Sequence, residues 1–390
     1  MNYALRSNDI RQANEKLVLS LVFQNKLISQ SQVVQITGLK APTVFRIFAK
    51  LEEAGFIHPC TTEQLPDGPV ESDRKGRRPS YYCAEHSSGY AVGVDFSSIG
   101  VSVILVDFGN RVIHQNSSEF SDSPDRGTTL ALIESMISHA LSETKVDKSA
   151  LLGICIAAPG VVDTESGVIL EYARIDGLSG YSLRDHFEEI FEAPVYVHNN
   201  ASVIASGAYY YGAARVEDSL LAVLVRFGVG AGLVSHGEIF LNGTNTALEV
   251  GRTAVCSSSI EDVVGNQSTL ETVVAESPLL RRLQEHYPVS SWTEVDEQLT
   301  SSQVNEVLEA ERLTFAMSVR NLFHIFHPDA ILLISRYALL SEFLADAARK
   351  ALPEVRVLSM VYDPVQACYG ATDIVFQRFF RVTPTQTPRS

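Results

Sequence analysis

Residues 29–57, SQSQVVQITGLKAPTVFRIFAKLEEAGFI, decide the fold of the N-terminal part of the chain. Ser29 and Gln32 have the spacing of a capping box, which predicts the start of a short helix. Gly38 predicts the turn that ends this helix. Pro42 is tolerated in the first turn of a following helix, because its missing N–H has no helical partner there. The stretch therefore predicts two helices separated by a tight turn.

The second of these helices, expected over residues 41–54, has one apolar face. Four large side chains at helical spacing predict a single buried stripe. They are Val44, Ile47, Phe48 and Leu51. A short helix, a glycine turn and a second helix with a small and basic outer face are typical of a helix-turn-helix, whose second helix enters the DNA major groove. A plain three-helix packing unit, with its first helix before residue 25, is the alternative.

The segment after these helices has the layout of a β-hairpin wing. Residues 59–75 are rich in Pro, Gly and Asp, and they lead through Gly76-Arg77-Arg78-Pro79 to the strand-like SYYC at 80–83. Two arginines between Gly and Pro suit the narrow minor groove or its flanking phosphates, whereas a solvated linker is the alternative. The predicted DNA-binding residues are Lys40, Pro42, Thr43, Arg46, Lys50, Arg77 and Arg78.

Charge is distributed unevenly along the 390 residues. The net charge is −15 overall, but residues 1–85 carry +2 and the remainder carries −17. This balance argues against nonspecific nucleic-acid binding by the whole molecule. No apolar run approaches the roughly 20 residues that a membrane span needs, and the start lacks the order of a secretory signal. We therefore expect a cytoplasmic protein with no membrane partner.

The five cysteines lie far apart, with no CxxC pair. They are Cys60, Cys83, Cys155, Cys256 and Cys368. This spacing is typical neither of a disulfide framework nor of a zinc knuckle. We therefore expect unpaired structural thiols.

From Gly89 onward, strands alternate with helices along the sequence. Residues 128–145 have the pattern of a helix and residues 151–162 that of a buried strand. Residues 219–240 have the pattern of two strands joined by a glycine-rich turn. This alternation predicts an α/β fold for the body of the protein.

A series of motifs in the body, taken with the N-terminal helices, resembles the ROK family. In chain order the motifs are Gly93-Val-Asp95, APGVVD at 158–163, HNNA at 198–201, GVGAG at 228–232, LEVG at 248–251, and Gly265-Asn266 through Leu270-Glu271. The family joins bacterial sugar kinases to transcription repressors of sugar metabolism. The resemblance covers nearly the whole chain.

The resemblance implies three units. Residues 1–85 would form a winged helix-turn-helix DNA-binding domain. Residues 86–200 and 201–390 would form the two α/β lobes of an actin-like ATPase body, with a C-terminal helix returning toward the first lobe.

The machinery of the family's kinases is altered here. Their first phosphate loop reads DxGGTK, where this chain has Asp95-Phe-Ser-Ser-Ile-Gly100, and Arg336 stands near the place of a Gly-Gly beside the adenine. The glycines at 228–232 survive in part, although a strand turn alone also explains them. The catalytic aspartate is replaced by Asn200, whose amide cannot take a proton from a sugar hydroxyl. We therefore expect no enzyme activity and no bound ATP.

The family's zinc site is also altered. The resemblance places its ligand positions on Arg252, Asp262, Val264 and Thr269. An arginine and a valine cannot ligate Zn²⁺, so we expect no metal and no other cofactor.

The polar residues that remain in the expected cleft suit a sugar, because amides and carboxylates match vicinal hydroxyls at fixed geometry. The predicted ligand-binding residues are Gly160, Asn199, Asn200, Glu249, Arg252 and Glu271. Two alternatives stay open. These residues could be inherited supports of the fold with no ligand, or Arg252 could receive an anionic group.

The sequence thus predicts a transcription regulator, a repressor of carbohydrate metabolism, with operator DNA and a sugar or sugar-phosphate effector as its partners. We expect a homodimer or homotetramer. One alternative is an active sugar kinase that carries a DNA-binding head. Another is a repressor that a protein partner controls without a small ligand.

Overall fold

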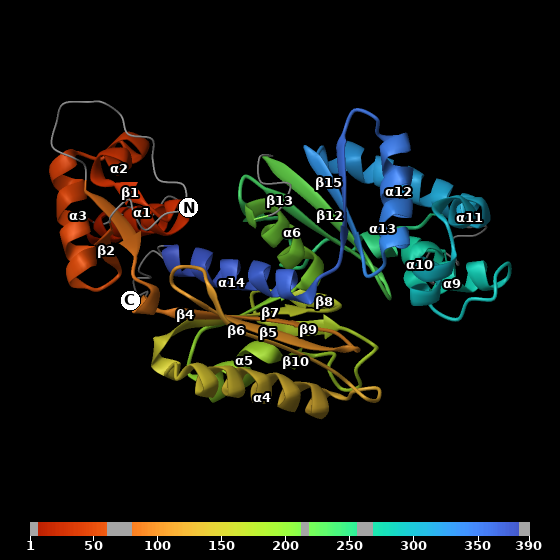
Figure 1. Cartoon of the computed structure of the whole chain (residues 1–390), viewed down its shortest axis with the longest axis horizontal. Coiled ribbons are helices and arrows are strands. Elements are labelled where there is room, and N and C mark those ends of the chain that lie inside the picture. Colours follow the sequence, from red (N-terminus) through yellow and green to blue (C-terminus); the bar gives the residue numbers. More distant parts are fainter. Residues whose placement is uncertain (1–6, 61–79, 212–217, 256–267, 382–390) are drawn as a thin grey trace, which may run out of the picture.

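The computed structural model describes residues 7–60, 80–211, 218–255 and 268–381 (Figure 1). The N-terminal head, up to residue 84, stands beside a body of two α/β lobes. No helix in the described part of the chain is long and apolar enough to cross a membrane.

The head contains three helices and a small antiparallel sheet of order β1-β3-β2. Its elements are α1 (Ser7–Asn25), β1 (Ile28–Ser29), α2 (Gln30–Thr37), α3 (Ala41–Glu53), β2 (Ile57–Cys60) and β3 (Tyr81–Ala84).

Local signals in the sequence set the ends of α2 and α3 as predicted. The Ser29 backbone N–H donates to Gln32 Oε1 over 2.8 Å, and the Gln32 N–H donates to Ser29 Oγ over 3.3 Å, which completes the capping box. Gly38 ends α2 in the left-handed conformation, with φ of +68°, where a side chain would be strained. Pro42 lies in the first turn of α3, and the predicted stripe from Val44 to Leu51 is buried.

The prediction of unpaired thiols is wrong for one pair, because Cys60 and Cys83 form a disulfide. Strands β2 and β3 pair in a register that places Cys60 opposite Tyr81, which leaves the two cysteines diagonal to each other with Cα atoms 6.0 Å apart. Cys155 and Cys368 are free and buried, as predicted, and Cys256 lies outside the described residues.

The first lobe is built on a five-stranded sheet of order β11-β7-β4-β5-β6. Helices α4 and α5 cover one face of this sheet, and the C-terminal helix α14 packs across the other (Figure 1). A small sheet of order β10-β9-β8 lies beside it. The elements are β4 (Tyr90–Phe96), β5 (Gly100–Asp107), β6 (Val112–Glu119), α4 (Arg126–Thr144), β7 (Leu151–Ala158), β8 (Val161–Asp163), β9 (Val168–Glu171), β10 (Tyr181–Ser182), α5 (Leu183–Phe191) and β11 (Val195–Asn199).

The second lobe has a five-stranded sheet of order β14-β13-β12-β15-β16. Helix α6 covers one face, and α8, α9, α12 and α13 pack on the other around Trp292. The elements are α6 (Asn200–Tyr211), β12 (Ser219–Val225), β13 (Val229–Ser235), β14 (Glu238–Ile239), α8 (Leu270–Val274), α9 (Glu276–Gln284), α10 (Trp292–Gln298), α11 (Ser301–Val307), α12 (Glu309–Phe326), β15 (Ala330–Ser335), α13 (Ala338–Ala351), β16 (Arg356–Val361) and α14 (Pro364–Phe380).

Helices α6 and α14 form the layer between the two sheets (Figure 1). Glycines allow their backbones to cross at close range: a Cβ on Gly370 would lie 2.2 Å from the carbonyl oxygen of Val203. A larger residue at position 370 would therefore separate the helices that join the lobes.

The C-terminal end of α14 contacts the head through a cluster of phenylalanines, which we call the aromatic junction. Phe23 of α1 and Phe376 of α14 have ring centroids 4.6 Å apart. The junction consists of Phe23, Phe56, Phe108, Phe376, Phe379 and Phe380. The head is thus packed onto the body through α14.

Candidate nucleic-acid interface and ligand pocket

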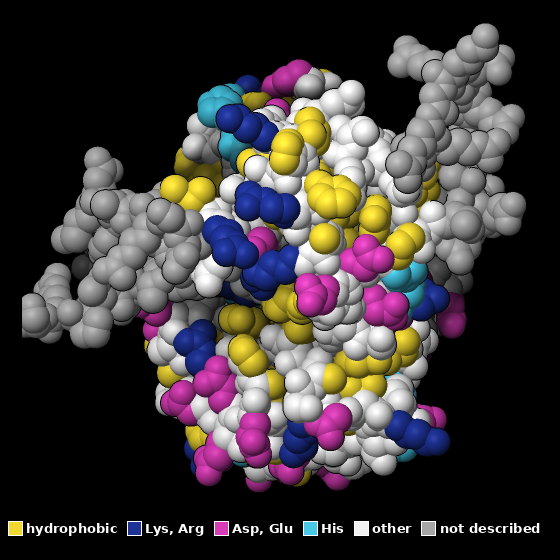
Figure 2. All heavy atoms as spheres, turned by 90° about the vertical axis from the view of Figure 1, so that its left-hand side faces the viewer, with side chains coloured by type: hydrophobic (Ala, Val, Ile, Leu, Met, Phe, Trp, Pro, Cys, Tyr) yellow, Lys and Arg dark blue, Asp and Glu magenta, His cyan; other side chains and the backbone are white. Residues whose placement is uncertain are grey.

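The outer face of α3 is the first candidate site. Lys40, Pro42 and Arg46 are exposed there, and Thr43 is partly exposed. No side chain caps the start of α3, where Pro42 has no N–H and the Thr43 and Val44 N–H groups donate to the Lys40 carbonyl. Figure 2 shows this side of the molecule, with Lys and Arg side chains gathered on its upper part and Asp and Glu prominent on its lower part.

The structure departs from the sequence-based prediction at two residues of α3. The Lys50 ammonium, a predicted DNA contact, forms an ion pair with Glu15 of α1. Phe45, which the sequence analysis did not select, is 62% exposed next to Arg46. The signal in the sequence was that Phe45 is a large aromatic residue outside the buried stripe. An exposed ring on such a helix can contact a thymine methyl group.

Arg77 and Arg78 lie outside the described residues. The two strands that flank their segment in sequence are described. Strands β2 and β3 pair antiparallel from Ile57 opposite Ala84 to Cys60 opposite Tyr81, which agrees with the predicted hairpin layout.

The second candidate site is a cavity of about 320 Å³ between the two lobes, within the size range of small-molecule pockets. The structure brings all six predicted ligand-binding residues together in its lining: Gly160, Asn199, Asn200, Glu249, Arg252 and Glu271. Its wall also includes side chains that the sequence analysis did not select, namely Glu171, Arg174, Arg226 and Phe227.

Asn199 and Asn200 have different roles in this lining. The Asn199 amide donates to the Gly160 carbonyl over 2.8 Å and accepts from the Ala201 N–H over 2.9 Å, so it ties the strand end to α6. The Asn200 side chain has no protein partner among the described residues, although it is nearly buried. Asn200 is therefore free to hydrogen-bond a ligand, whereas Asn199 holds the local backbone.

Arg252 is neutralised by two carboxylates. Its Nη2 lies 2.6 Å from Glu171 Oε2, and its Nε lies 3.2 Å from Glu249 Oε2. The hydrogen bond with Glu171 raises the pKa of Arg252, and burial raises the pKa of Glu249. Because both sides of the guanidinium are occupied, this geometry does not favour Arg252 as the receptor of an added anion.

Glu271 reaches the pocket across two glycines. Its Oε2 would lie 3.0 Å from a Cβ on Gly228 and 3.1 Å from a Cβ on Gly251, so neither position accommodates a side chain without movement. Gly160 has φ of +79°, and its Cβ would lie 2.2 Å from the Glu171 carbonyl oxygen. These glycines leave room for the polar groups that line the cavity.

The two turns that the resemblance places at the phosphate loops each form internal hydrogen bonds. The Ser97 N–H donates to the Gly100 carbonyl over 3.0 Å, and the Ile99 N–H donates to Ser97 Oγ over 3.2 Å. In the second turn, the Arg226 N–H donates to the Gly228 carbonyl over 2.9 Å. Gly232 is needed for packing, since its Cβ would lie 2.5 Å from the backbone of α6. Both segments are thus ordinary hairpin turns.

Cationic and aromatic side chains fill the space beside these turns. Arg226 is 7% exposed, and its guanidinium lies 4.3 Å from the ring centre of Tyr362. Its Nε and Nη1 have no hydrogen-bond partner among the described residues. Arg336 is held by Glu276, with Nε 3.0 Å from Oε1, and lies 4.6 Å from the ring centre of Phe227. Arg336 was predicted from the sequence as a change, but its partner Glu276 was not.

Asp95 connects this region to α14. It is 4% exposed at the end of β4, and it accepts a hydrogen bond from the hydroxyl of Tyr362, two residues before α14. Burial raises the pKa of Asp95 to about 6, and the charge of Arg226 and the Tyr362 hydrogen bond oppose this rise. The three side chains form one buried unit, of which Arg226 lines the pocket.

Comparison with known proteins gives a consistent result at the level of sequence. Residues 91–364 match the ROK family. The chain is 24% identical over 372 residues to the xylose repressor of Caldicellulosiruptor bescii, covering 91% of this chain and 90% of the relative. It is 26% identical over 275 residues to the DNA-binding transcriptional dual regulator NagC of Escherichia coli K12, covering 70% of this chain and 65% of the relative.

Solved structures share the fold. A ROK family transcriptional regulator, described as a homolog of the E. coli Mlc protein, superposes with a TM-score of 0.76 at 18% identity, covering 95% of this chain and 97% of the other. A ROK family glucokinase from Streptomyces griseus, solved with glucose and AMPPNP, superposes with a TM-score of 0.62 at 19% identity, covering 74% of this chain and all of the kinase. These matches confirm the predicted two-lobed α/β body, and the chain belongs to the ROK family.

Proposed function

We propose that this protein is a DNA-binding transcription repressor of sugar metabolism whose kinase-like body senses a sugar or a sugar derivative. Repressors of this kind are among its relatives over nearly the full length of the chain. The observation that carries the proposal is the presence in one chain of an exposed α3 face with basic side chains and a polar pocket, with α14 contacting the head at the aromatic junction.

The operator is read by α3. Arg46 and Phe45 project from its outer face, opposite the buried stripe, where base edges in the major groove are within reach. Arg77 and Arg78 contact the minor groove or its phosphates, as the sequence predicts. Since such heads bind paired half-sites, the working form is a homodimer or a homotetramer in the cytoplasm.

The effector binds through Asn200 and Glu271. Both side chains line the pocket and have no protein partner among the described residues, so a sugar hydroxyl would satisfy them. The other predicted side chains form the wall of the pocket, because each already has a hydrogen-bond or ion-pair partner in the protein. They are Asn199, Glu249 and Arg252.

The body is not a kinase in this proposal. Asn200 has no basic lone pair with which to deprotonate a sugar hydroxyl. Arg226 and Phe227 lie where the resemblance places the second phosphate loop, and the Arg336–Glu276 pair lies beside them. The bulk of these side chains blocks the close approach to backbone N–H groups that ATP phosphates need.

Effector binding acts on the head through α14. Arg226 lines the pocket and stacks on Tyr362, and Tyr362 precedes α14, whose other end carries Phe376 in the aromatic junction with the head. A ligand that moves Arg226 would therefore bias the position of the helix that supports the head.

Two measurements test the proposal. A thermal-shift screen against neutral sugars, sugar phosphates and amino sugars should find a ligand, and a ligand at 100 times its Kd stabilises a fold by about 2.7 kcal/mol. The same ligand must change the affinity for a DNA duplex selected by the protein from a random pool. Sugar-dependent ATP turnover at ordinary enzyme rates would instead establish the kinase alternative. Regulation of DNA binding by a protein partner, without any small ligand, would establish the alternative of a partner-controlled repressor.

A further inference from the structure

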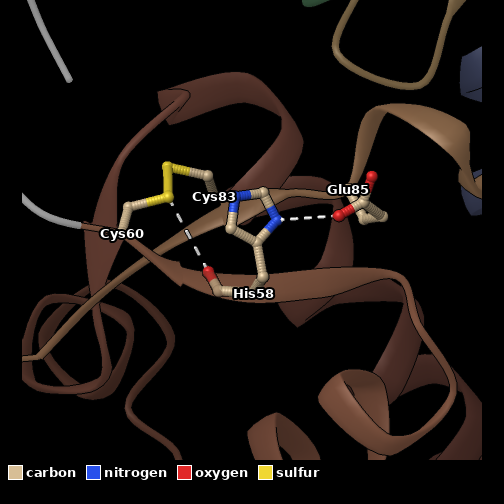
Figure 3. The surroundings of a disulfide bond; sticks show 4 residues. All are labelled: His58, Cys60, Cys83 and Glu85. Carbon is tan, nitrogen blue, oxygen red and sulfur yellow. Dashed lines mark hydrogen bonds and ion pairs between the residues drawn. A yellow bond between two sulfur atoms is a disulfide. The ribbon is translucent and has the colours of Figure 1, made fainter.

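The Cys60–Cys83 pair lies where the wing joins the head. Strand β2 ends at Cys60 and β3 begins at Tyr81, so the bond spans a sequence separation of 23 residues that includes Arg77 and Arg78 (Figure 3). The predicted wing thus begins and ends at the disulfide. Formation or reduction of this bond would therefore act at the base of the segment that we propose contacts DNA.

The neighbours of the pair suit thiol chemistry. His58 lies opposite Cys83 across the two strands, and one ring nitrogen of His58 faces the sulfur atoms (Figure 3). The other, Nδ1, lies 3.2 Å from Glu85 Oε2. The ligand atoms of His58, Cys60 and Cys83 all lie within 4.8 Å of one another. A histidine beside a thiol can hydrogen-bond the thiolate, which favours this reactive form.

The other two described cysteines differ from this pair. Cys155 and Cys368 are fully buried, and burial raises the pKa of both thiols well above the ordinary value. Cys60 and Cys83 are only half-buried, so small molecules in solution can reach them. Reactivity is therefore concentrated at the wing base among the described thiols.

We propose that Cys60 and Cys83 form a reversible thiol–disulfide switch that strengthens DNA binding when it is oxidised. A repressor works in the compartment that holds the chromosome, where thiol reductants keep most cysteines reduced and where disulfides are mostly transient or redox-sensing. Two reachable cysteines with Cα atoms 6.0 Å apart can close and open without rearrangement of the strands. The effect on DNA rests on the wing contact proposed above.

The oxidant is a low-molecular-weight disulfide, R–S–S–R. One cysteine thiolate attacks it, forms a mixed disulfide and releases R–S⁻. The second cysteine, after losing its proton, attacks the protein sulfur of the mixed disulfide, forms the Cys60–Cys83 bond and releases the second R–S⁻. The two thiolates take up the two protons, so the protein is oxidised by two electrons and two R–SH are produced. His58 is a positioning residue that stabilises the first thiolate.

The consequence for DNA binding follows from the position of the disulfide at the end of the described hairpin. Strand β2 is at the edge of the sheet, and Cys60 opposite Tyr81 is its last pair with β3. In the dithiol state no covalent bond joins β2 and β3 at this end. The disulfide limits how far the two strand ends can separate, so the base of the predicted wing is held in one arrangement before the head binds DNA.

The test compares full-length protein treated with oxidised glutathione and with dithiothreitol. Peptide mapping by mass spectrometry should find the Cys60–Cys83 linkage only in the first sample. For a duplex selected from a random pool, we expect a Kd roughly fivefold lower in the oxidised protein. The double variant Cys60→Ser/Cys83→Ser should bind like the reduced protein under both conditions, and Cys256→Ser should respond like wild type. His58→Gln should slow bond formation measured by iodoacetamide trapping.

Three results would overturn the switch. They are no linkage in oxidised glutathione, a linkage that leaves the Kd unchanged, and stoichiometric Zn²⁺ in the reduced protein that Cys60→Ser/Cys83→Ser loses. The third result would mean that His58, Cys60 and Cys83 bind a metal ion. Failure of the proposed function is separable, because no duplex would then be selected, whereas the linkage is measured without DNA.

Discussion

The buried carboxyl of Asp95 gives a direct test of how the base of the pocket is held. Burial raises its pKa from the ordinary 3.8 to about 6, against the opposing effects of Arg226 and Tyr362. A carboxyl group whose pKa is higher in the folded protein than in the unfolded chain favours folding most below the unfolded value. That contribution is lost as the pH rises through the folded value, here between about 4 and 6.

The size of the effect follows from the two pKa values. At 1.36 kcal/mol per pH unit, the difference corresponds to about 3 kcal/mol in total, of which about 2 kcal/mol is lost between pH 4.5 and 7.5. The variant Asp95→Asn keeps an oxygen that can accept from Tyr362 but does not titrate. The melting temperature of the variant, relative to wild type, should therefore rise with pH by roughly 3 °C over this range.

The assay is differential scanning calorimetry of wild type and Asp95→Asn at several pH values. Tyr362→Phe is the matched variant: it removes a hydrogen bond that lowers the pKa of Asp95, so the loss of stability should move to higher pH. A difference in melting temperature between Asp95→Asn and wild type that is constant with pH would refute the reasoning. It would mean that the charge of Arg226 outweighs burial and keeps Asp95 ionised.

Three further predictions concern DNA and effector binding. Arg46→Ala should weaken binding to the selected duplex by about 1–3 kcal/mol and relax its specificity, measured as Kd values for the selected and point-mutated duplexes. Arg77→Ala/Arg78→Ala should weaken binding to every duplex alike and reduce the slope of log K against log salt by about 2. Asn200→Ala and Glu271→Ala should each remove most of the effector's influence on the Kd for DNA while ligand-free affinity stays unchanged.

Each of these predictions has an outcome that contradicts it. Unchanged operator affinity in Arg46→Ala would remove α3 as the reader. A loss confined to one duplex in the double arginine variant would mean base readout rather than phosphate contact. An undiminished effector response in Asn200→Ala and Glu271→Ala would place the effector elsewhere.

Sequence alone was sufficient where the determining interaction is local. The capping box of Ser29 and Gln32, the turn at Gly38 and the buried stripe of α3 each depend on residues within a few positions of one another. The gathering of six polar residues in one pocket was available only through the family resemblance, because they come from segments as far apart as Gly160 and Glu271.

The remaining features depend on long-range pairing. The disulfide follows from the register of β2 and β3, which cysteine spacing does not determine. Glu276 holds Arg336 from 60 positions away, and Tyr362 donates to Asp95 across most of the chain. Asn199 was predicted as a ligand contact, but its amide is occupied by backbone groups at Gly160 and Ala201.

Arg226 links the proposed loss of catalysis to the proposed gain of regulation. It lies where the resemblance places the second phosphate loop, and the bulk of its side chain takes up space that ATP phosphates would need beside the backbone. The same guanidinium stacks on Tyr362, whose hydroxyl binds Asp95 and whose chain leads directly into α14. A kinase would need the space occupied by the Arg226 side chain for phosphate, so it could not also have the contact between Arg226 and Tyr362. In a protein that does not transfer phosphate, this contact can connect the sugar pocket to α14, which packs against the DNA-binding head.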